Sequence, residues 1–562
     1  MPALSSSASA TESDSPAPGA TKQLVAAGWR LGALPSAFGA RGLAELVGLV
    51  LAVALALLAV VHLDATDRSW LLYYDSDSVL PALVRGSVQA GQPQDWFLSA
   101  VLFIPEMGLY FALAALGLGV KGTLALNAVV NLLLLYAALR FLSGIAQRAL
   151  PPSRRVGGAL VAFATVVFLM LLEDSPRGDT FEIASLLATT TYYGLTVLAS
   201  ITATGLAARL VTAPPSRRRR WQEAALTAMS AGATLTNPLY LAWAAMPLVL
   251  VLALMAGRRV IGWHRFLRVG AFLLLGGGVG FAARIPFAHL VAKDGPDYAK
   301  PGLAAWAALR YPLSLADRTS TIPGALALTL VVALILVSAI VYRRSLASRD
   351  ATTLMVSGIG WVAPVAVLVG SIALGAYTPR YVQPLFFAPV CTLVFAPRLF
   401  PHGIAFVRRL SKREIRRLLA SILAVLLVVS AGLTLALGRS AAVVDPDIQC
   451  VDAWTTANQR TGAGDFFSTR GPKAYLAEPY RLIQVDYLFR AYPWLADRAD
   501  YSRSMVSFVL ADSLTESEHP RLALPPAART APSTTIRCGR YTITDFGTDI
   551  LPIGPVPAHF MQ

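Results

Sequence analysis

One stretch of the sequence restricts the fold more than any other. Residues Leu43–Leu63 read LAELVGLVLAVALALLAVVHL, with Glu45 as the only charged side chain. A helix needs about 20 mainly apolar residues to cross the hydrocarbon core of a membrane. The run is too long, and too far inside the chain, to be a cleaved signal peptide. It therefore predicts a membrane-spanning helix.

The rest of the chain extends this interpretation. Hydrophobic residues make up 55% of the 562 residues and charged residues only 14%, which is not the balance of a soluble protein. Together with 43–63, we predict about 11 transmembrane helices in a mainly α, polytopic membrane region that covers residues 43–438. The other spans are expected at 122–142, 156–172, 183–206, 221–236, 239–256, 269–289, 322–342, 351–374, 382–398 and 418–438.

The formal net charge of +16 is distributed unevenly along the chain. Basic residues gather on alternate loops, and the positive-inside rule places such loops in the cytoplasm. The run RRRR at 217–220 is therefore interpreted as an orientation signal, and no nucleic-acid partner is expected. Residues 1–42 are polar and of low complexity, which predicts a disordered cytoplasmic N-terminus. An odd number of spans then places the C-terminus outside a bacterial plasma membrane.

One apolar segment does not fit this alternation. Residues 97–120 are apolar enough to cross, but they contain Pro105 and Glu106, and a span here would reverse every later loop. We predict a juxtamembrane or re-entrant segment at the outer surface, where protein can cover a non-spanning backbone. The first outer loop then extends from 64 to 121.

The tail, residues 439–562, changes composition and has no further span. It is acidic, aromatic and rich in turns, which predicts a small extracytoplasmic α/β domain. Residues 479–495 have helix-like spacing of apolar side chains, and residues 533–546 alternate like strands. Cys450 and Cys538 both fall in this tail, where an oxidising compartment allows a disulfide. The third cysteine, Cys391, lies inside an apolar span and is expected to be inert.

Acidic residues are scarce in the membrane region, so their positions are informative. Asp75 and Asp77, in YYDSDSVL, precede an amphipathic segment that would hold them near the membrane surface. Such carboxylates can act as a general base or help to bind a divalent cation. The alternative is that they are ordinary loop carboxylates. Arg380 and Tyr381 stand at the outer end of another span. The sequence leaves two roles open for them, as an interfacial anchor or as ligands of a phosphate.

The order of these features resembles the GT-C superfamily of membrane glycosyltransferases, which includes protein O-mannosyltransferases and the lipid A aminoarabinose transferases. Their long outer loop opens with an acidic motif, matched here by Asp75-Ser76-Asp77. A later juxtamembrane turn is similar to residues 105–110, a further turn to LTNPLY at 235–240, and a late Arg-Tyr-x-x-Pro to 380–384. The chain departs from the family at two places. The usual adjacent Asp-Glu pair is Asp75-Ser76-Asp77 here, and Asn237 stands where a lysine is usual.

The resemblance implies an inverting transfer of a sugar from a polyprenyl-phosphate donor to a lipid, glycan or protein acceptor. Asp75, or alternatively Asp77, would be the base. Arg380, Tyr381 and Arg284 would bind the donor phosphate. Glu106, Glu173 and Asp174 would bind sugar hydroxyls or a divalent cation. For these three residues and for Arg284, the alternative is a role in packing or anchoring.

Two other functions stay open at the level of sequence. A transporter or flippase would place charges near the membrane midplane and often shows internal repeats. The sequence has almost no charge there and no visible repeat, which favours the enzyme. A non-enzymatic assembly subunit, with the tail as its working part, would leave the acidic motif dispensable.

Overall fold

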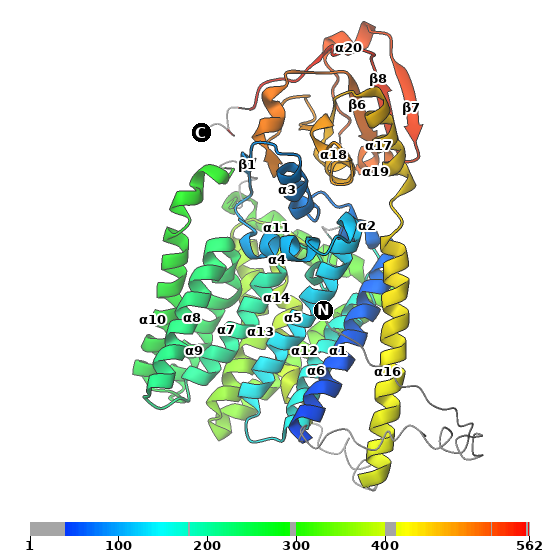
Figure 1. Cartoon of the computed structure of the whole chain (residues 1–562). Helices are drawn as coiled ribbons and strands as arrows, with labels where there is room; N and C mark the ends of the chain where they lie inside the picture. Colours follow the sequence, from blue (N-terminus) through cyan, green and yellow to red (C-terminus); the bar gives the residue numbers. More distant parts are fainter. Residues whose placement is uncertain are drawn as a thin grey trace, which may run out of the picture.

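The computed structural model of the protein describes residues 40–177, 180–292, 299–399, 412–518, 520–557 and 560. Residues 1–39 of the N-terminus that the sequence predicts to be disordered lie outside the described residues. The described chain forms a long helical bundle with a smaller mixed domain stacked on one end (Figure 1). We call the end of the bundle that carries this domain the domain-side end, and the opposite one the far end.

The bundle consists of helices that match the predicted spans in order. They are α1 (Ala40–Asp64), α5 (Gly119–Ala146), α6 (Pro152–Met170), α7 (Gly194–Leu210), α8 (Arg217–Thr236), α9 (Met246–Gly257), α10 (Trp263–Ala282), α12 (Ile322–Ser348), α13 (Ala351–Ala373), α14 (Pro384–Val390), α15 (Ala396–Leu399) and α16 (Lys412–Ala441). Among the described residues, 7 helices are long and apolar enough to cross a membrane. The others are shorter or more polar. The protein is thus a mainly helical, polytopic membrane protein.

One predicted span begins later than expected. Residues 183–206 were predicted to be helical throughout, but α7 starts at Gly194 and is preceded by a single 3₁₀ turn, Ser185–Ala188. The segment between them is buried without being helical, because other elements satisfy its backbone. The Asn131 side chain donates a hydrogen bond of 3.0 Å to the carbonyl oxygen of Thr189. This part of the prediction was wrong, and the segment contributes to the candidate site instead.

Short helices cover the domain-side end: α2 (Ser69–Tyr73), α3 (Leu80–Gln89), α4 (Ile104–Ala114) and α11 (Ala304–Arg318). In Figure 1, α4 lies across the bundle rather than along it. Its 11 residues extend for about 17 Å, which is too short to cross a bilayer. The segment at 97–120 therefore does not span, in agreement with the sequence.

Where the structure describes them, the predicted basic loops lie at the far end (Figure 1). Arg140, near the end of α5, forms an ion pair with Glu45 in the first turns of α1. Arg398 donates to the carbonyl oxygen of Ala146, and Arg265 donates to that of Val211. These contacts join the ends of several helices at the side away from the C-terminal domain (Figure 1).

The C-terminal domain is a mixed α/β module. A five-stranded sheet has the order β3-β2-β6-β8-β7, with β2 parallel to β3 and β6, and β8 antiparallel to β6 and β7. The strands of the structure are β1 (Trp96–Phe97), β2 (Gly462–Asp465), β3 (Leu482–Val485), β4 (Ala496–Asp497), β5 (Met505–Val506), β6 (Phe508–Asp512), β7 (Thr534–Cys538), β8 (Tyr541–Asp545) and β9 (Leu551–Pro552). The helices of the domain are α17 (Pro446–Asn458), α18 (Phe466–Lys473), α19 (Ser513–Glu518) and α20 (Pro526–Thr530).

Two predictions for the tail have different outcomes. The strand-like alternation at 533–546 corresponds to β7 and β8, which confirms it. The helix predicted from 479–495 is wrong, because this stretch forms a short 3₁₀ turn and then β3. All four residues of β3 are buried, so the strand lacks the alternation that would have identified it.

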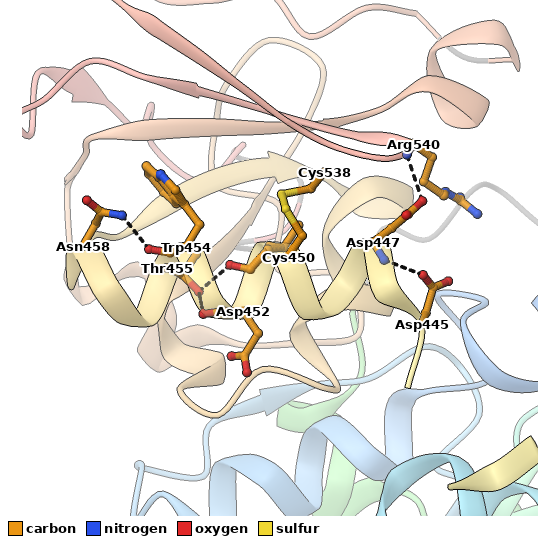
Figure 2. Close-up of a disulfide and its surroundings, with 10 residues drawn as sticks. Asp445, Asp447, Cys450, Asp452, Trp454, Thr455, Asn458, Cys538 and Arg540 are labelled. Carbon is orange, nitrogen blue, oxygen red and sulfur yellow. Dashed lines mark hydrogen bonds between the residues drawn. A yellow bond between two sulfur atoms is a disulfide. The ribbon is translucent and has the colours of Figure 1, made fainter. Parts of the chain in front are cut away.

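A disulfide joins α17 to β7. The Cys450 and Cys538 sulfurs are bonded, with a Cα–Cα separation of 5.4 Å (Figure 2). The bond closes a sequence separation of 88 residues. Loop entropy alone would make such a crosslink worth about 4 kcal/mol.

The domain also pairs with the long loop of the membrane region. β1, from that loop, pairs antiparallel with β4 of the domain. The Asp497 carboxylate accepts hydrogen bonds from the Ser87 hydroxyl at 3.0 Å and from the backbone N–H of Asp95 at 3.2 Å. The domain is therefore fastened to the segment that follows the acidic motif.

Candidate functional site

The acidic motif lies in the turn between α2 and α3. Asp75 Oδ2 accepts hydrogen bonds from the backbone N–H groups of Asp77 and Ser78, both at 3.1 Å. This Asx-type turn fixes the direction of the carboxylate. Within the described part of the chain, Asp75 Oδ1 accepts no hydrogen bond. One oxygen thus anchors the turn and the other is available.

Asp77 and Arg380 form an ion pair across the site. Arg380 Nη1 lies 2.7 Å from Asp77 Oδ2, and the two side chains are 30% and 22% exposed. Arg380 belongs to the 3₁₀ turn Pro379–Val382, directly before α14. Its Nε has no hydrogen-bond partner among the described residues. The structure thus brings together three of the residues that the sequence singled out, and the guanidinium still has free donors.

Aromatic residues surround the guanidinium. The centre of the Arg380 guanidinium lies 5.4 Å from the Tyr192 ring centroid and 5.9 Å from that of Tyr381. Tyr193 packs 6.1 Å from the Tyr381 ring, and its φ of 69° is in the left-handed region that few residues other than glycine adopt. Such a conformation costs about 1–3 kcal/mol and is concentrated at functional sites.

Neighbouring segments hold these aromatic residues in place. Gln383 donates a hydrogen bond of 2.9 Å to the carbonyl oxygen of Tyr192, and the Trp243 indole donates one of 2.8 Å to that of Tyr381. The Tyr192 hydroxyl donates to Asp75 Oδ2 at 3.0 Å. The sequence does not identify Tyr192 and Tyr193 as site residues, because the apolar composition of their segment predicts a transmembrane helix.

The environment of Asp75 changes its acidity. Burial, together with the negative charge of Asp77, raises the pKa of Asp75 to about 6. The hydrogen bonds from Ser78 and Tyr192, and the charge of Arg380, lower it in part. A carboxylate with a pKa near this value is ionised at neutral pH and is a stronger proton acceptor than an ordinary aspartate.

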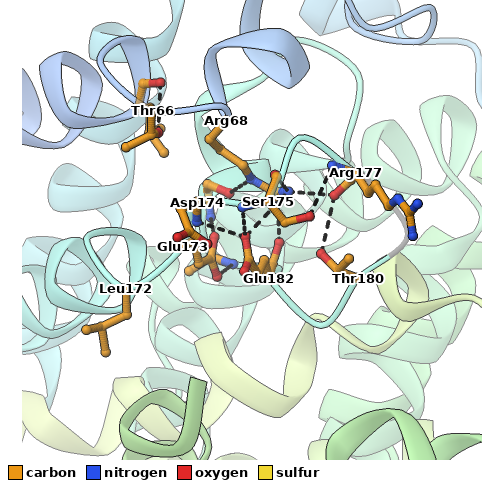
Figure 3. A network of polar contacts seen from close by, with 12 residues as sticks. Thr66, Arg68, Leu172, Glu173, Asp174, Ser175, Arg177, Thr180 and Glu182 are labelled. Atoms are coloured by element: carbon orange, nitrogen blue, oxygen red, sulfur yellow. Dashed lines mark hydrogen bonds and ion pairs between the residues drawn. The ribbon is translucent and has the colours of Figure 1, made fainter. Parts of the chain in front are cut away.

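Glu173 belongs to a separate cluster, which fastens the loop before Tyr192 (Figure 3). Its two carboxylate oxygens accept hydrogen bonds of 2.8 Å from the backbone N–H groups of Ala184 and Ser185. Glu182 accepts from the N–H of Asp174 at 3.0 Å and pairs with Arg318 at 2.5 Å. We call these residues, together with Arg68, the loop cluster. It orders the chain that leads to Tyr192.

Arg68 is the centre of the loop cluster. It is 1% exposed, and it donates hydrogen bonds of 2.6 Å to the carbonyl oxygens of Ser175 and Arg177. Its Nε donates to the Ser185 hydroxyl at 2.8 Å, and Nη1 lies 3.8 Å from the Glu182 carboxylate. These bonds tie the loop to the segment just before α2.

Glu106 and Arg284 lie at other positions of the same end. Glu106 is in the first turn of α4, where burial raises its pKa to about 7, and its Oε2 has no partner among the described residues. Arg284 donates hydrogen bonds of 2.6 Å to the carbonyl oxygens of Leu235 and Ala100. Its two terminal nitrogens therefore connect the long loop to the end of α8.

Metal-binding residues are not clustered in the described part of the chain. No group of three or more histidine, cysteine, aspartate or glutamate side chains there has an arrangement that could hold a metal ion. A cavity of about 400 Å³ lies between α3, α4 and the C-terminal domain, with Arg85, Tyr110 and Lys473 among its lining residues. It does not include the aspartates of the acidic motif.

Comparisons with known proteins bear on the fold. No protein-family model matches the sequence, and no curated protein matches it. Among solved structures, the chain is similar to ArnT from Cupriavidus metallidurans bound to undecaprenyl phosphate, with a TM-score of 0.50 and 16% sequence identity, over 88% of this chain and 97% of ArnT.

Two more solved structures are similar to a lesser degree. ArnT from the same organism in the apo state has a TM-score of 0.49 at 15% identity, over 87% of this chain and 96% of that one. The Archaeoglobus fulgidus oligosaccharyltransferase in complex with Zn and sulfate has a TM-score of 0.41 at 11% identity, over 83% of this chain and 68% of that one.

The bundle, the short helices at the domain-side end and the stacked domain thus define a class of fold. This fold is similar to that of ArnT, which agrees with the GT-C fold that the sequence motifs predicted. The similarity to ArnT extends over most of the length of both chains.

Proposed function

We propose that the protein is a membrane glycosyltransferase that moves a sugar from a polyprenyl-phosphate donor to an acceptor hydroxyl. The observation that carries this proposal is the contact between the acidic motif and Arg380 at the domain-side end of a GT-C fold. Carboxylates supply a proton acceptor and arginine supplies a phosphate ligand, so the two halves of the reaction meet in one place. The bound undecaprenyl phosphate of ArnT supports the class of donor.

Asp75 is the base in this proposal. Its Oδ2 is held by the turn and by Tyr192, while its Oδ1 accepts no hydrogen bond within the described residues. Its pKa of about 6 keeps it ionised at neutral pH. Asp77, by contrast, is paired with Arg380. Asp77 thus orients the arginine, although its own free oxygen leaves it as the alternative base.

Arg380 is the proposed ligand of the donor phosphate. Only one of its nitrogens contacts Asp77, so the planar fork can still offer donors to a phosphate. Tyr381 lies beside the guanidinium and would support the same group. Arg284 is already bonded to two carbonyl oxygens, and we assign it to shaping the loop.

The reaction is a direct displacement. Asp75 takes the proton of the acceptor hydroxyl as its oxygen attacks the anomeric carbon of the sugar. The bond from that carbon to the phosphate oxygen breaks, and the polyprenyl phosphate leaves with the electron pair. Arg380 stabilises the charge that develops on the leaving group, which is often the largest contribution to catalysis. The configuration at the anomeric carbon is inverted.

Several finer parts of the proposal follow the fold and the charge pattern. The domain-side end would face the outside of a bacterial plasma membrane, because the basic loops lie at the far end. The acceptor is a lipid, glycan or protein hydroxyl that reaches this end. Glu106 is a candidate for binding a sugar hydroxyl, since its carboxylate has an oxygen without a partner in the described structure. Glu173 and Asp174 are assigned to the loop cluster.

The test is transfer by the full chain in nanodiscs. Wild type and the variants Asp75→Ala, Asp77→Ala and Arg380→Ala are compared with a labelled polyprenyl-phosphate sugar and a panel of acceptors. The proposal expects product from wild type and a severe loss in the Asp75 and Arg380 variants. Transfer that survives all three substitutions would contradict the site. Movement of the lipid-linked sugar across the bilayer without transfer would indicate a flippase.

A further inference from the structure

A helix of the C-terminal domain lies directly against the acidic motif. Arg470, on α18, is 2% exposed, and its Nε donates a hydrogen bond of 2.7 Å to the carbonyl oxygen of Ser76. Ser76 is the residue between the two aspartates. A side chain that is 394 positions later in the sequence therefore holds the centre of the motif.

Further contacts fasten the same segment to the domain. The Ser76 hydroxyl donates to the carbonyl oxygen of Phe466 at 3.1 Å, and the Tyr475 hydroxyl donates to that of Tyr73 at 2.8 Å. A Cβ built on Gly471 would lie 2.8 Å from the carbonyl oxygen of Tyr74. The backbones of α18 and the acidic segment are thus in contact, and only glycine permits this approach.

The guanidinium of Arg470 is well fixed but not saturated. Nη1 donates to the carbonyl oxygen of Leu495 and, at 3.4 Å, to Gln484, and the group lies 5.2 Å from the Phe466 ring centroid. Nη2 is buried and has no partner among the described residues. Burial lowers the pKa of Arg470 to about 10, and the negative charges of Asp77 and Asp75 oppose this effect.

We propose that Arg470 is a positioning residue for sugar transfer, through which the C-terminal domain completes the catalytic site. This proposal rests on the glycosyltransferase function above. Arg470 fixes the Ser76 carbonyl and thereby the turn that directs both carboxylates. Its positive charge also favours the ionised form of Asp75. In the described part of the chain, ionisable side chains that interact electrostatically with Asp75 or Asp77 include Tyr192, Arg380 and Tyr492. The domain is then a part of the enzyme and not an appended module.

The experiment compares Arg470→Gln and Arg470→Lys in the full chain in nanodiscs, with rates measured against pH. We expect Arg470→Gln to lower kcat by about 10- to 100-fold, because small displacements of catalytic groups have effects of this size. The KM for the donor should change little. Loss of the positive charge raises the pKa of Asp75, so the acid limb of the profile should move to higher pH. Arg470→Lys keeps the positive charge, so the acid limb should return to its wild-type pH. Only part of the wild-type kcat should be recovered.

The matched control is Arg481→Gln. Arg481 is a buried arginine of the same domain that pairs with Glu478 and does not contact the acidic motif. A role in domain stability alone would affect both arginines alike, lowering the unfolding temperature without moving the pH profile. Arg481→Gln should therefore keep the wild-type kcat and profile. A folded Arg470→Gln variant with wild-type kcat and an unmoved acid limb would overturn the proposal.

If Arg470→Gln does not fold, a second variant tests whether α18 positions the acidic motif. Gly471→Ala keeps Arg470 but forces α18 away from Tyr74. It should lower kcat, and wild-type kcat in this variant would overturn the proposal. The two proposals fail separately. If the Asp75 and Arg380 variants lose transfer while the α18 variants keep it, only the role of Arg470 is wrong. If all of them keep it, the proposed site itself is wrong.

Discussion

Two clusters of carboxylates and arginines lie at the domain-side end, and they use their oxygen atoms differently. In the loop cluster, both oxygens of Glu173 accept backbone N–H groups, and Glu182 is bonded to two further N–H groups and to Arg318. In the acidic motif, Asp75 and Asp77 each have one oxygen that accepts no hydrogen bond within the described residues.

The two clusters also differ in exposure. The Arg68 and Glu182 side chains are 1% and 3% exposed, whereas those of Arg380 and Asp77 are 30% and 22% exposed. A buried cluster whose glutamate oxygens all accept hydrogen bonds holds a loop in place. A half-buried one with free oxygens and free donors can exchange its contacts for those of a substrate. Charge composition alone would not distinguish the two clusters, but the number of hydrogen bonds that their carboxylate oxygens accept does.

The largest expected effect is that of Asp75→Asn on transfer. The asparagine oxygen can still accept the two backbone N–H groups of the turn, but it cannot take up a proton. We expect the rate to fall by about 10²- to 10⁴-fold, with little change in the unfolding temperature. Initial rates in nanodiscs and thermal unfolding of the same samples measure both. A rate equal to wild type would remove the distinction between the clusters.

The matching change in the loop cluster is Arg68→Gln, which should act on stability. Glu182 keeps its ion pair with Arg318, but the Ser185 hydroxyl and the carbonyl oxygens of Ser175 and Arg177 lose their donor. Each buried polar group left without a partner costs about 1–3 kcal/mol. Chemical unfolding of the purified protein measures this cost. Arg490→Gln is the control, because Arg490 forms an ion pair with Asp486 and is 40% exposed. Such surface pairs contribute about 0–1 kcal/mol. Equal losses in both variants would contradict the structural role of the loop cluster.

Arg380→Gln should have a smaller effect on rate than Asp75→Asn. Removing one group that stabilises developing charge lowers kcat by about 10²- to 10³-fold. The KM for the donor should rise as well, because the phosphate is bound before the reaction. Arg380→Lys keeps the positive charge but not the planar guanidinium, so its kcat and its KM for the donor should lie between those of wild type and Arg380→Gln. Steady-state kinetics with varied donor give both parameters. If only the KM for the acceptor changed, Arg380 would bind the acceptor and not the donor phosphate.

Tyr192→Phe should have the smallest effect on transfer, and it should shift the acid limb of the pH–rate profile in one particular direction. The Tyr192 hydroxyl donates to Asp75 and lowers its pKa, so its loss raises that pKa further above about 6. The base works when ionised, and activity is lost as the pH falls through this pKa. The acid limb should therefore move to higher pH, by about one unit for one such hydrogen bond.

Asp77→Asn gives the opposite shift and serves as the comparison for Tyr192→Phe. It removes a negative charge that raises the pKa of Asp75. The acid limb should then move to lower pH. If both variants shift the limb in the same direction, Asp75 is not the group that the profile reports.

The sequence predicted the parts of the molecule that depend on local patterns. Hydropathy located the spans, and the conflict with charge alternation at 97–120 correctly indicated a segment that does not cross. The class of fold followed from short motifs whose order matched a family, and the structural comparison confirms it. Asp75, Asp77 and Arg380 were singled out because charged residues are rare in such a chain.

The contacts that complete the site could not be predicted. Arg380 and Asp77 are 303 residues apart, and Arg470 and Ser76 are 394 apart. Tyr192 lay in a segment whose apolar composition indicated a span, and only its bonds to neighbouring helices show why it is a loop. The helix expected at 479–495 failed because a fully buried strand and a helix have similar composition over so few residues.

In the proposed mechanism, the acidic motif performs the transfer and the loop cluster only supports it. The most direct measurement is the transfer rate per folded molecule for Asp75→Asn and Arg68→Gln, side by side in nanodiscs with the same labelled donor. We predict that Asp75→Asn is stable and almost inactive, and that the folded fraction of Arg68→Gln transfers sugar at a rate close to wild type. An active Asp75→Asn variant beside an inactive, folded Arg68→Gln variant would contradict this account.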